Sequence, residues 1–274
     1  MKKHIIAVII LILAALSALI LYLDNNLVTL TKITVTINDL PESFKGFRIA
    51  QVSDLHNASF GDSNKRLIAV LKKSKPDIIV ITGDLIDARK TDTEVALKFV
   101  ESAVGIAPVY FVTGNHELQA KEAYKNLKTQ MIASGAISLS DEKTYIEREN
   151  EKIALIGIND CSSAADLDQK LTGLMDDDGT YHILLSHRPE HFDVYSACGL
   201  NVAFTGHTHG GQIRLPFIGG LFAPGQGYFP KYDAGLYKNG DFNMIVSRGL
   251  GNSSFPLRVN NFPEVIIAQL ETSE

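Results

Sequence analysis

The sequence predicts an α/β fold preceded by one membrane-spanning helix, and three observations support this prediction. Short, continuously apolar runs alternate with amphipathic helical patterns through the first half of the 274-residue chain. The second half is richer in strand patterns, and a charge-free run of 19 residues precedes both halves. Buried strands joined through helices by short connections are typical of a mostly parallel sheet with right-handed crossovers.

The charge-free run, Ile5–Leu23, is long enough to cross a bilayer. As a helix rising ~1.5 Å per residue it spans about 28 Å, close to the ~30 Å apolar core of a membrane. Two lysines precede it, so the positive-inside rule places the N-terminus in the cytoplasm. A cleaved signal peptide is the alternative, but its best cleavage site, Ala15–Ser17, lies inside the apolar run. We therefore expect a retained anchor over residues 1–26 and one extracytoplasmic domain over residues 27–274, in a single-pass protein of the cytoplasmic membrane.

The composition excludes several classes of protein. With 45% hydrophobic and 21% charged residues the chain is too apolar to be disordered. A net charge of −5 argues against a general nucleic-acid binder. Lys2 and Lys3 are the only Lys or Arg before residue 24, so the body carries 24 basic against 31 acidic side chains, a net −7. Cys161 and Cys198 leave a disulfide and two free thiols both open.

The first half of the domain reads as strands separated by helices. Thr alternates with Ile and Val in residues 27–37, the period of a half-buried strand. Runs such as DIIVIT, residues 77–82, are apolar throughout and indicate strands covered on both faces. We expect strands at 27–37, 47–52, 77–82 and 109–113, and helices at about 63–75, 93–103 and 120–134.

The second half is predicted to be richer in strands. A hairpin is expected around residues 148–151, and a short helix over 164–174. Residues 215–232 are rich in Gly, Pro and aromatic residues, which indicates a long ordered loop. The expected strands are 144–147, 152–157, 182–185, 201–205, 242–246 and 265–270.

Chemistry-bearing residues directly follow five of these strands. In open α/β sheets, the carboxyl ends of the strands form the edge where ligands bind. The five segments are Ser53-Asp54-Leu55-His56, Gly83-Asp84, Gly114-Asn115-His116-Glu117, Ser186-His187 and Gly206-His207-Thr208-His209-Gly210-Gly211.

These side chains are donors that suit divalent metal ions such as Mn, Fe, Zn or Co. There is no Cys among them, which argues against a structural zinc site. Eight polar groups are too many for one tetrahedral ion, whereas two ions ~3.5–4 Å apart need a bridging carboxylate and favour phosphoryl chemistry. Each motif alone has an ordinary explanation, since Asp54 could cap a turn and His187 could be a buried histidine. The five together make the ordinary explanation improbable.

The ordered set of motifs resembles the calcineurin-like metallophosphoesterase superfamily, over roughly residues 45–270. The apolar N-terminal segment and the motif Gly-His-Thr-His-Gly-Gly-Gln resemble those of the bacterial membrane-associated or exported members of this superfamily. The resemblance implies a four-layer α/β/β/α sandwich. It also implies that the first metal is bound by Asp54, His56 and His209, the second by Asn115, His187 and His207, and both by Asp84. His116 would contact phosphate and protonate the leaving oxygen, or only orient its neighbours.

One departure from the family pattern concerns an arginine. The family often continues Gly-Asp as Gly-Asp-x-x-Asp-Arg, but here Ala88 follows Asp87 and the arginine comes one place later. The sequence therefore argues against a role for Arg89 in holding Asp87 or in binding phosphate.

Three further residues are candidates for substrate contact. Arg188 and Arg248 could bind phosphate through a guanidinium fork, and Asn57 could line the cleft. Ordinary ion pairs and turn stabilisation are the alternatives for them. The apolar residues of 215–232 either pack over the second sheet or form a rim that accepts a lipid-linked phosphate.

The sequence thus predicts a dinuclear metal-dependent phosphoester hydrolase, a phosphodiesterase or phosphatase, at the outer face of the cytoplasmic membrane. A non-catalytic metal-binding surface protein is the alternative from another class. Hydrolysis of another ester by a single metal is a third possibility, in which Asn115 and His187 would be structural.

Overall fold

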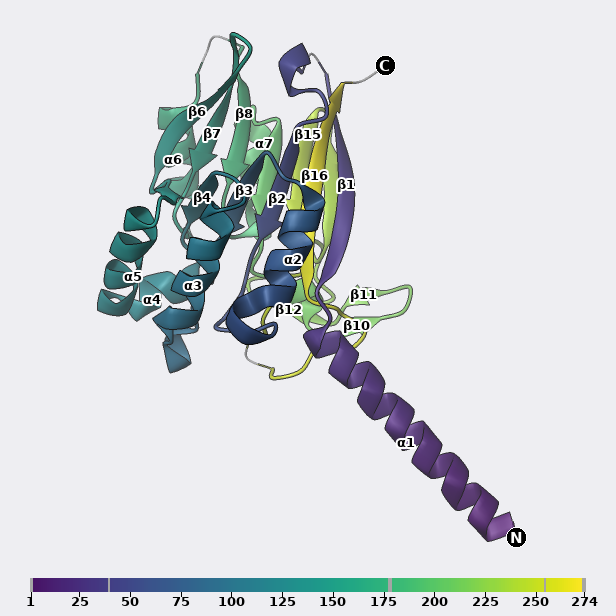
Figure 1. Cartoon of the computed structure of the whole chain (residues 1–274). Helices are drawn as coiled ribbons and strands as arrows, with labels where there is room; N and C mark the ends of the chain where they lie inside the picture. Colours follow the sequence, from purple (N-terminus) through teal and green to yellow (C-terminus); the bar gives the residue numbers. More distant parts are fainter. Residues whose placement is uncertain (1, 39, 177–178, 254, 273–274) are drawn as a thin grey trace.

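The computed structural model describes residues 2–38, 40–176, 179–253 and 255–272 (Figure 1). Two six-stranded mixed sheets pack face to face, with helices on both outer faces. This confirms the four-layer α/β/β/α arrangement.

The first sheet has the order β1-β16-β2-β3-β4-β5. All its neighbours run parallel except β16 and β2. Its strands are β1 (Thr29–Ile37), β2 (Arg48–Val52), β3 (Ile78–Thr82), β4 (Val109–Val112), β5 (Ile137–Ser138) and β16 (Glu264–Thr272).

The second sheet has the order β14-β15-β9-β8-β7-β6, with antiparallel pairs at its two ends and parallel pairs between them. Its strands are β6 (Glu142–Arg148), β7 (Glu151–Gly157), β8 (Tyr181–Leu185), β9 (Val202–Thr205), β14 (Gly235–Asn239) and β15 (Phe242–Val246).

Helices cover the outer face of each sheet because their apolar stripes pack on it. In the first layer, α2 (Lys65–Ser74), α3 (Thr93–Val104) and α5 (Glu122–Ala133) pack on the first sheet through residues such as Leu71, Phe99 and Leu127. In the last layer, α6 (Ala164–Leu174) and α7 (Phe192–Ala197) pack on the second sheet.

The apolar strands of the first sheet are buried on both faces, as their uninterrupted sequence indicated. In β3, Ile79 and Ile81 face the helices, whereas Ile78 and Val80 face the other sheet. Successive side chains of a strand point to opposite faces, so a strand between two covered faces is apolar at every position.

Several segments differ from the sequence prediction, among them the short strand β5, which was not expected. The helix expected over 120–134 is two helices, α4 (Asn115–Ala120) and α5, so α4 begins within the Gly-Asn-His-Glu segment itself. The expected loop 215–232 contains two short strand pairs, β10 (Arg214–Leu215) with β11 (Gly219–Gly220) and β12 (Phe222–Ala223) with β13 (Gly227–Tyr228). Strand β14 was not expected, because GLYKN lacks an alternating pattern.

Within the described ranges, the remaining elements are one long helix and five short 3-10 turns. Helix α1 (Lys2–Asn26) projects from the fold (Figure 1) and is long and apolar enough to cross a membrane, with a mean hydropathy of 3.1 over an 18-residue stretch. The turns are η1 (Glu42–Phe44), η2 (Asp62–Asn64), η3 (Ala88–Lys90), η4 (Pro189–His191) and η5 (His209–Gly211). Both cysteines are free thiols.

Candidate metal centre and active site

The loops that follow β2, β3, β8 and β9 meet at one edge of the two sheets. The backbone N–H of Asp54 donates to the carbonyl of Gly83 at 3.0 Å, and that of Gly206 donates to the carbonyl of His187 at 3.0 Å. The N–H of His56 also donates to the carbonyl of Asp84 at 3.0 Å. These backbone bonds fix the side chains of neighbouring strand ends relative to one another.

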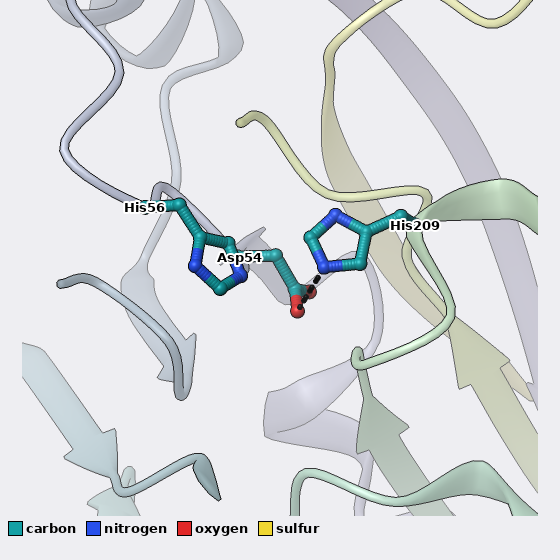
Figure 2. Close-up of side chains that lie close together, drawn as sticks. All are labelled: Asp54, His56 and His209. Carbon is teal, nitrogen blue, oxygen red and sulfur yellow. Dashed lines mark ion pairs between the residues drawn. The ribbon is translucent and has the colours of Figure 1, made fainter. Parts of the chain in front are cut away.

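A first group of candidate ligands consists of Asp54, His56 and His209. Figure 2 shows their side chains pointing toward one another, and one ligand atom from each lies within 4.8 Å of the others. His209 Nε2 lies 3.5 Å from Asp54 Oδ1. His209 Nδ1 lies 3.3 Å from the carbonyl of Gly251, to which it can donate its proton. Such a bond leaves Nε2 free to bind a metal.

A second group consists of Asp84, His187 and His207, also within 4.8 Å of one another. His187 donates through Nδ1 to the carbonyl of Thr82 at 2.8 Å, so its Nε2 faces the group, 3.3 Å from Asp84 Oδ2 and 3.1 Å from His207 Nδ1. The same Oδ2 lies 3.4 Å from Nε2 of His56 in the first group. Asp84 therefore stands between the two groups, where a bridging ligand would have to be.

Unsatisfied polar atoms indicate that these groups fit cations. Among the residues that the structure describes, the buried side-chain oxygen of Asn115 has no hydrogen-bond partner, and neither ring nitrogen of His56 has one. Buried polar atoms without partners are uncommon in folded proteins, and an ion is one of the standard reasons for them. Two carboxylates, four imidazoles and an amide oxygen also suit borderline divalent ions.

The pKa shifts of the candidate ligands also agree with a site that binds cations. Burial opposes protonation of His187, but the nearby Asp84 carboxylate outweighs it and raises the His187 pKa to about 10. Burial also opposes ionisation of Asp84, yet His187 and His56 hold its pKa well below the usual range. Burial raises the pKa of Asp54 to about 6. A divalent cation can take the place of the proton on His187.

The backbone is unusual at the same residues. Five of the seven candidate ligands have positive φ angles between 44° and 68°: Asp54, His56, Asp84, His207 and His209. Left-handed backbone is uncommon in non-glycine residues, and it gathers at functional sites.

His116 lies beside the first group, its ring centroid 4.5 Å from that of His56. Its Nδ1 accepts the N–H of Ala88 at 3.0 Å and lies 3.4 Å from Oδ1 of Asp87. Because Nδ1 accepts, the neutral ring carries its proton on Nε2, which is then available as a donor.

The inference that Arg89 does not hold Asp87 is wrong. Arg89 donates to the Asp87 carboxylate through Nε at 2.9 Å and Nη2 at 2.6 Å. The extra residue is accommodated because Ala88–Lys90 forms the 3-10 turn η3, which Asp87 caps by accepting the N–H of Arg89. The turn brings the displaced guanidinium back to Asp87.

Glu117 was not assigned a role from the sequence. Its buried carboxylate accepts the backbone N–H groups of Asp84 at 2.7 Å, Gly114 at 2.8 Å and Ile86 at 3.2 Å. Burial raises the pKa of Glu117 to about 7, although these bonds oppose the rise. Glu117 thus ties the loop after β3 to the start of α4. Its place directly after Asn115-His116 is the only signal the sequence offers for it.

The three candidate substrate contacts differ in position. Arg188 lies beside the second group, with Nη1 3.5 Å from His207 Nε2, and is held by two bonds to Asp160 at 2.7 and 3.0 Å. Arg248 instead pairs with Glu264 at 2.6 Å. Asn57 donates to the carbonyl of Lys90 at 2.6 Å.

Comparisons with known proteins identify the same family as the motifs. A profile of the calcineurin-like phosphoesterase family matches residues 47–211. The chain is 31% identical to the uncharacterized metallophosphoesterase YkuE of Bacillus subtilis over 92% of this chain and 88% of the relative. It is 29% identical to the phosphodiesterase YaeI of Escherichia coli over 82% of both chains.

A solved structure shares the fold. The crystal structure of TT1561 from Thermus thermophilus matches with a TM-score of 0.50 and 10% identity, over 75% of this chain and 91% of that one. The chain therefore belongs to the calcineurin-like phosphoesterase family, and it is a phosphoric ester hydrolase.

Proposed function

We propose that the protein is a dinuclear metal-dependent phosphodiesterase that acts at the outer face of the cytoplasmic membrane. The observation that carries the proposal is the position of Asp84, whose Oδ2 lies 3.4 Å from His56 and 3.3 Å from His187. One carboxylate oxygen thus faces both candidate ligand groups. The name of the Escherichia coli relative, a phosphodiesterase, supports diesters as the substrate class.

In this proposal the seven side chains hold two divalent cations. Asp54, His56 and His209 bind one, Asn115, His187 and His207 bind the other, and Asp84 contacts both. When bound, such a pair supplies activated water near neutral pH and neutralises charge on the phosphoryl group. Manganese is our first candidate, with iron, zinc and cobalt as the other cations that this donor set suits.

His116 serves as the proton donor to the leaving oxygen. In the neutral ring Nδ1 accepts the N–H of Ala88, so His116 becomes an acid only when it takes up a second proton at Nδ1 and releases that N–H; it then gives its Nε2 proton to the leaving oxygen and returns to the neutral form. Asp87 stands 3.4 Å from Nδ1 and can stabilise the ring when it is charged. Arg188, fixed by Asp160 at the edge of the second group, provides a positive charge for a phosphoryl oxygen.

Helix α1 holds the catalytic domain at the membrane, with the domain outside the cytoplasm. The helix has the length and hydropathy of a span, and the two lysines at its start favour a cytoplasmic N-terminus. The substrate is then a phosphate ester of the cell envelope, including lipid-linked phosphates. A reporter enzyme that is active only outside the cytoplasm, fused to the C-terminus, should be active; an inactive fusion that is stably produced would contradict this location.

Metal content and turnover test the catalytic proposal together. The full chain in detergent is stripped with a chelator, reloaded with Mn²⁺ and assayed on bis-p-nitrophenyl phosphate, with bound metal counted by mass spectrometry. We expect two ions per chain and activity that the chelator abolishes. Asn115→Ala should lose one ion, whereas His116→Ala should keep both and lower kcat by about 10²–10⁴-fold.

A matched control is His4→Ala, which removes an exposed histidine from the start of α1. It should change neither metal content nor kcat. Reloaded wild-type protein with almost no bound metal, or His116→Ala at wild-type kcat, would contradict the proposed roles.

A further inference from the structure

Two loops at the end of the fold nearest α1 carry a concentration of exposed, large apolar side chains. We call this surface the apolar rim; it consists of Phe217, Ile218, Phe222, Tyr228, Phe229, Phe255, Leu257 and Val259. Phe217 is fully exposed and Tyr228 is 73% exposed. The five rim residues of 215–232 therefore do not pack over the second sheet, whereas Tyr232 of the same segment does, stacked on Phe192 of α7. Soluble monomers rarely expose a large contiguous apolar patch unless it contacts something.

The apolar rim is tied directly to the end of α1. Asn25 donates from Nδ2 to the carbonyl of Arg258 at 3.0 Å and accepts the N–H of Arg258 at 2.9 Å. Asp24 is buried and accepts the N–H of Asn260 at 2.6 Å. In Figure 1, α1 leaves the fold at the end where β10, β11 and β12 lie. The helix proposed to cross the membrane is thus fixed beside the rim.

The loop that holds α1 has an apolar outer side and a polar inner side. Phe255, Leu257 and Val259 point outward, whereas Arg258 between them is fully buried. The Arg258 guanidinium donates to the carbonyls of Gly251 at 2.6 Å and Arg248 at 2.8 Å. Because these hydrogen bonds hold the inner side of the loop in place, the outward apolar residues have fixed positions on the surface.

A cavity borders the apolar rim and reaches one candidate metal ligand, His209. It has a volume of about 340 Å³, within the range of small-molecule sites. Its walls include Leu221, Phe222, Tyr228 and Phe255 from the two loops, and His209 also lines it. An apolar chain that enters at the rim would therefore end beside a candidate metal ligand.

From these contacts we infer that the apolar rim lies in the surface of the bilayer and that the cavity takes the hydrocarbon chain of a lipid phosphoester. The lipid remains in the membrane while its phosphate reaches the metal centre. The occupant is a lipid because the rim is continuous with the end of the proposed membrane helix, through the bonds of Asn25 and Asp24. This inference rests on the proposed function and narrows its substrate class to lipids.

Burial of the rim can be measured without turnover, because the chain contains no Trp. The full-length Phe217→Trp variant is placed in phosphatidylcholine vesicles with and without brominated acyl chains. We expect blue-shifted emission that the brominated lipid quenches. Ile132→Trp, at an exposed position on α5, is the control and should be unaffected. If the Phe217→Trp emission stays red-shifted and unquenched, the rim is not in the bilayer and the inference fails; a protein partner would then be its occupant.

The cavity is tested with two phosphodiesters that share one chromophore, methyl and dodecyl p-nitrophenyl phosphate. In the vesicles, kcat/KM for the dodecyl ester should exceed that for the methyl ester at least tenfold. The double variant Phe222→Ser, Tyr228→Ser should lose at least tenfold on the dodecyl ester and stay within twofold on the methyl ester. Ile132→Ser, matched to Phe222 at 48% exposure, should change neither value.

The two proposals fail in distinguishable ways. Equal wild-type kcat/KM for both esters, or equal losses on both in the double variant, would overturn the lipid inference and leave phosphodiester hydrolysis intact. No hydrolysis of either ester by metal-loaded protein would instead overturn the proposed function, while the quenching experiment still decides whether the rim is buried.

Discussion

Replacing Gly114 by alanine tests how closely two strand ends must approach to build the proposed metal centre. Gly114 has φ −99° and ψ −173°, extended backbone that any residue adopts. A Cβ added there would lie 2.7 Å from Cγ of Asp84 and 2.7 Å from the backbone nitrogen of Asp84. The substitution therefore introduces a steric conflict with the central carboxylate and no backbone strain.

The size of the effect follows from these distances. Carbon atoms in contact lie about 3.5–4.0 Å apart, so Asp84 must move by about 1 Å. Metal–ligand distances vary by only about 0.2 Å, and a displacement of about 1 Å in an active site can cost about 10²-fold in rate. We expect Gly114→Ala to bind less than one cation per chain, to lose about 10²-fold in kcat, and to be destabilised by about 1–3 kcal/mol through overpacking.

Metal counting, kcat on bis-p-nitrophenyl phosphate and urea unfolding measure the three effects. The control is Gly173→Ala in α6, where an added Cβ would meet no atom of the described residues within 4 Å. It should leave metal and kcat unchanged and stabilise the helix by about 0.5–1 kcal/mol. A Gly114→Ala protein with two cations and wild-type kcat would refute the argument that the end of β4 crowds Asp84.

Three further predictions concern the polar groups around the site. Arg89→Ala should lower kcat about tenfold, which is part of the 10²–10⁴-fold that a positioned general acid provides. It should keep both cations, because it releases Asp87 and removes no ligand. Loss of metal in this variant would contradict the prediction. The pKa of Asp87 is lowered to about 2 because bonds from Arg89 outweigh its burial. The stability that the Asp87–Arg89 pair contributes is therefore complete above pH ~4 and is lost as the pH falls through about 2. In urea titrations, the difference in unfolding free energy between wild type and Arg89→Ala should become smaller from pH 6 to pH 3. A difference that stays constant would exclude a stabilising role for the pair. Asp84→Asn should reduce bound Mn²⁺ from two ions to fewer than one, and full occupancy by mass spectrometry would show that Asp84 does not serve both groups.

Much of the fold could be predicted because the burial of a strand determines which of its positions are apolar. Ile78 to Ile81 are apolar at every position because both faces of β3 are covered. The ligand-bearing segments could be located for a related reason, since each polar residue directly follows a buried strand. Strand β14 could not be recognised in this way. It is an edge strand whose positions are half-buried or exposed, so its sequence needs no apolar alternation.

The supporting contacts of the site could not be predicted, since they depend on backbone geometry. Glu117 acts by accepting three N–H groups from two segments, and no side-chain pattern encodes that. Arg89 reaches Asp87 only because η3 turns the chain. Arg258 lies in a loop where arginine usually indicates a surface residue, yet it is fully buried.

The left-handed backbone of the candidate ligands explains why so many hydrogen bonds hold the surrounding loops. Residues held in such conformations cost about 1–3 kcal/mol each, and five candidate ligands share this feature. Glu117 and Arg258 hold the backbone of these loops, and the Gly251 carbonyl that accepts from Arg258 lies 3.3 Å from His209 Nδ1. These contacts hold the ligand-bearing backbone in place, which reduces the ordering that cation binding requires. Substitutions that relax these loops would stabilise the metal-free chain and at the same time remove the geometry that the phosphoesterase site needs.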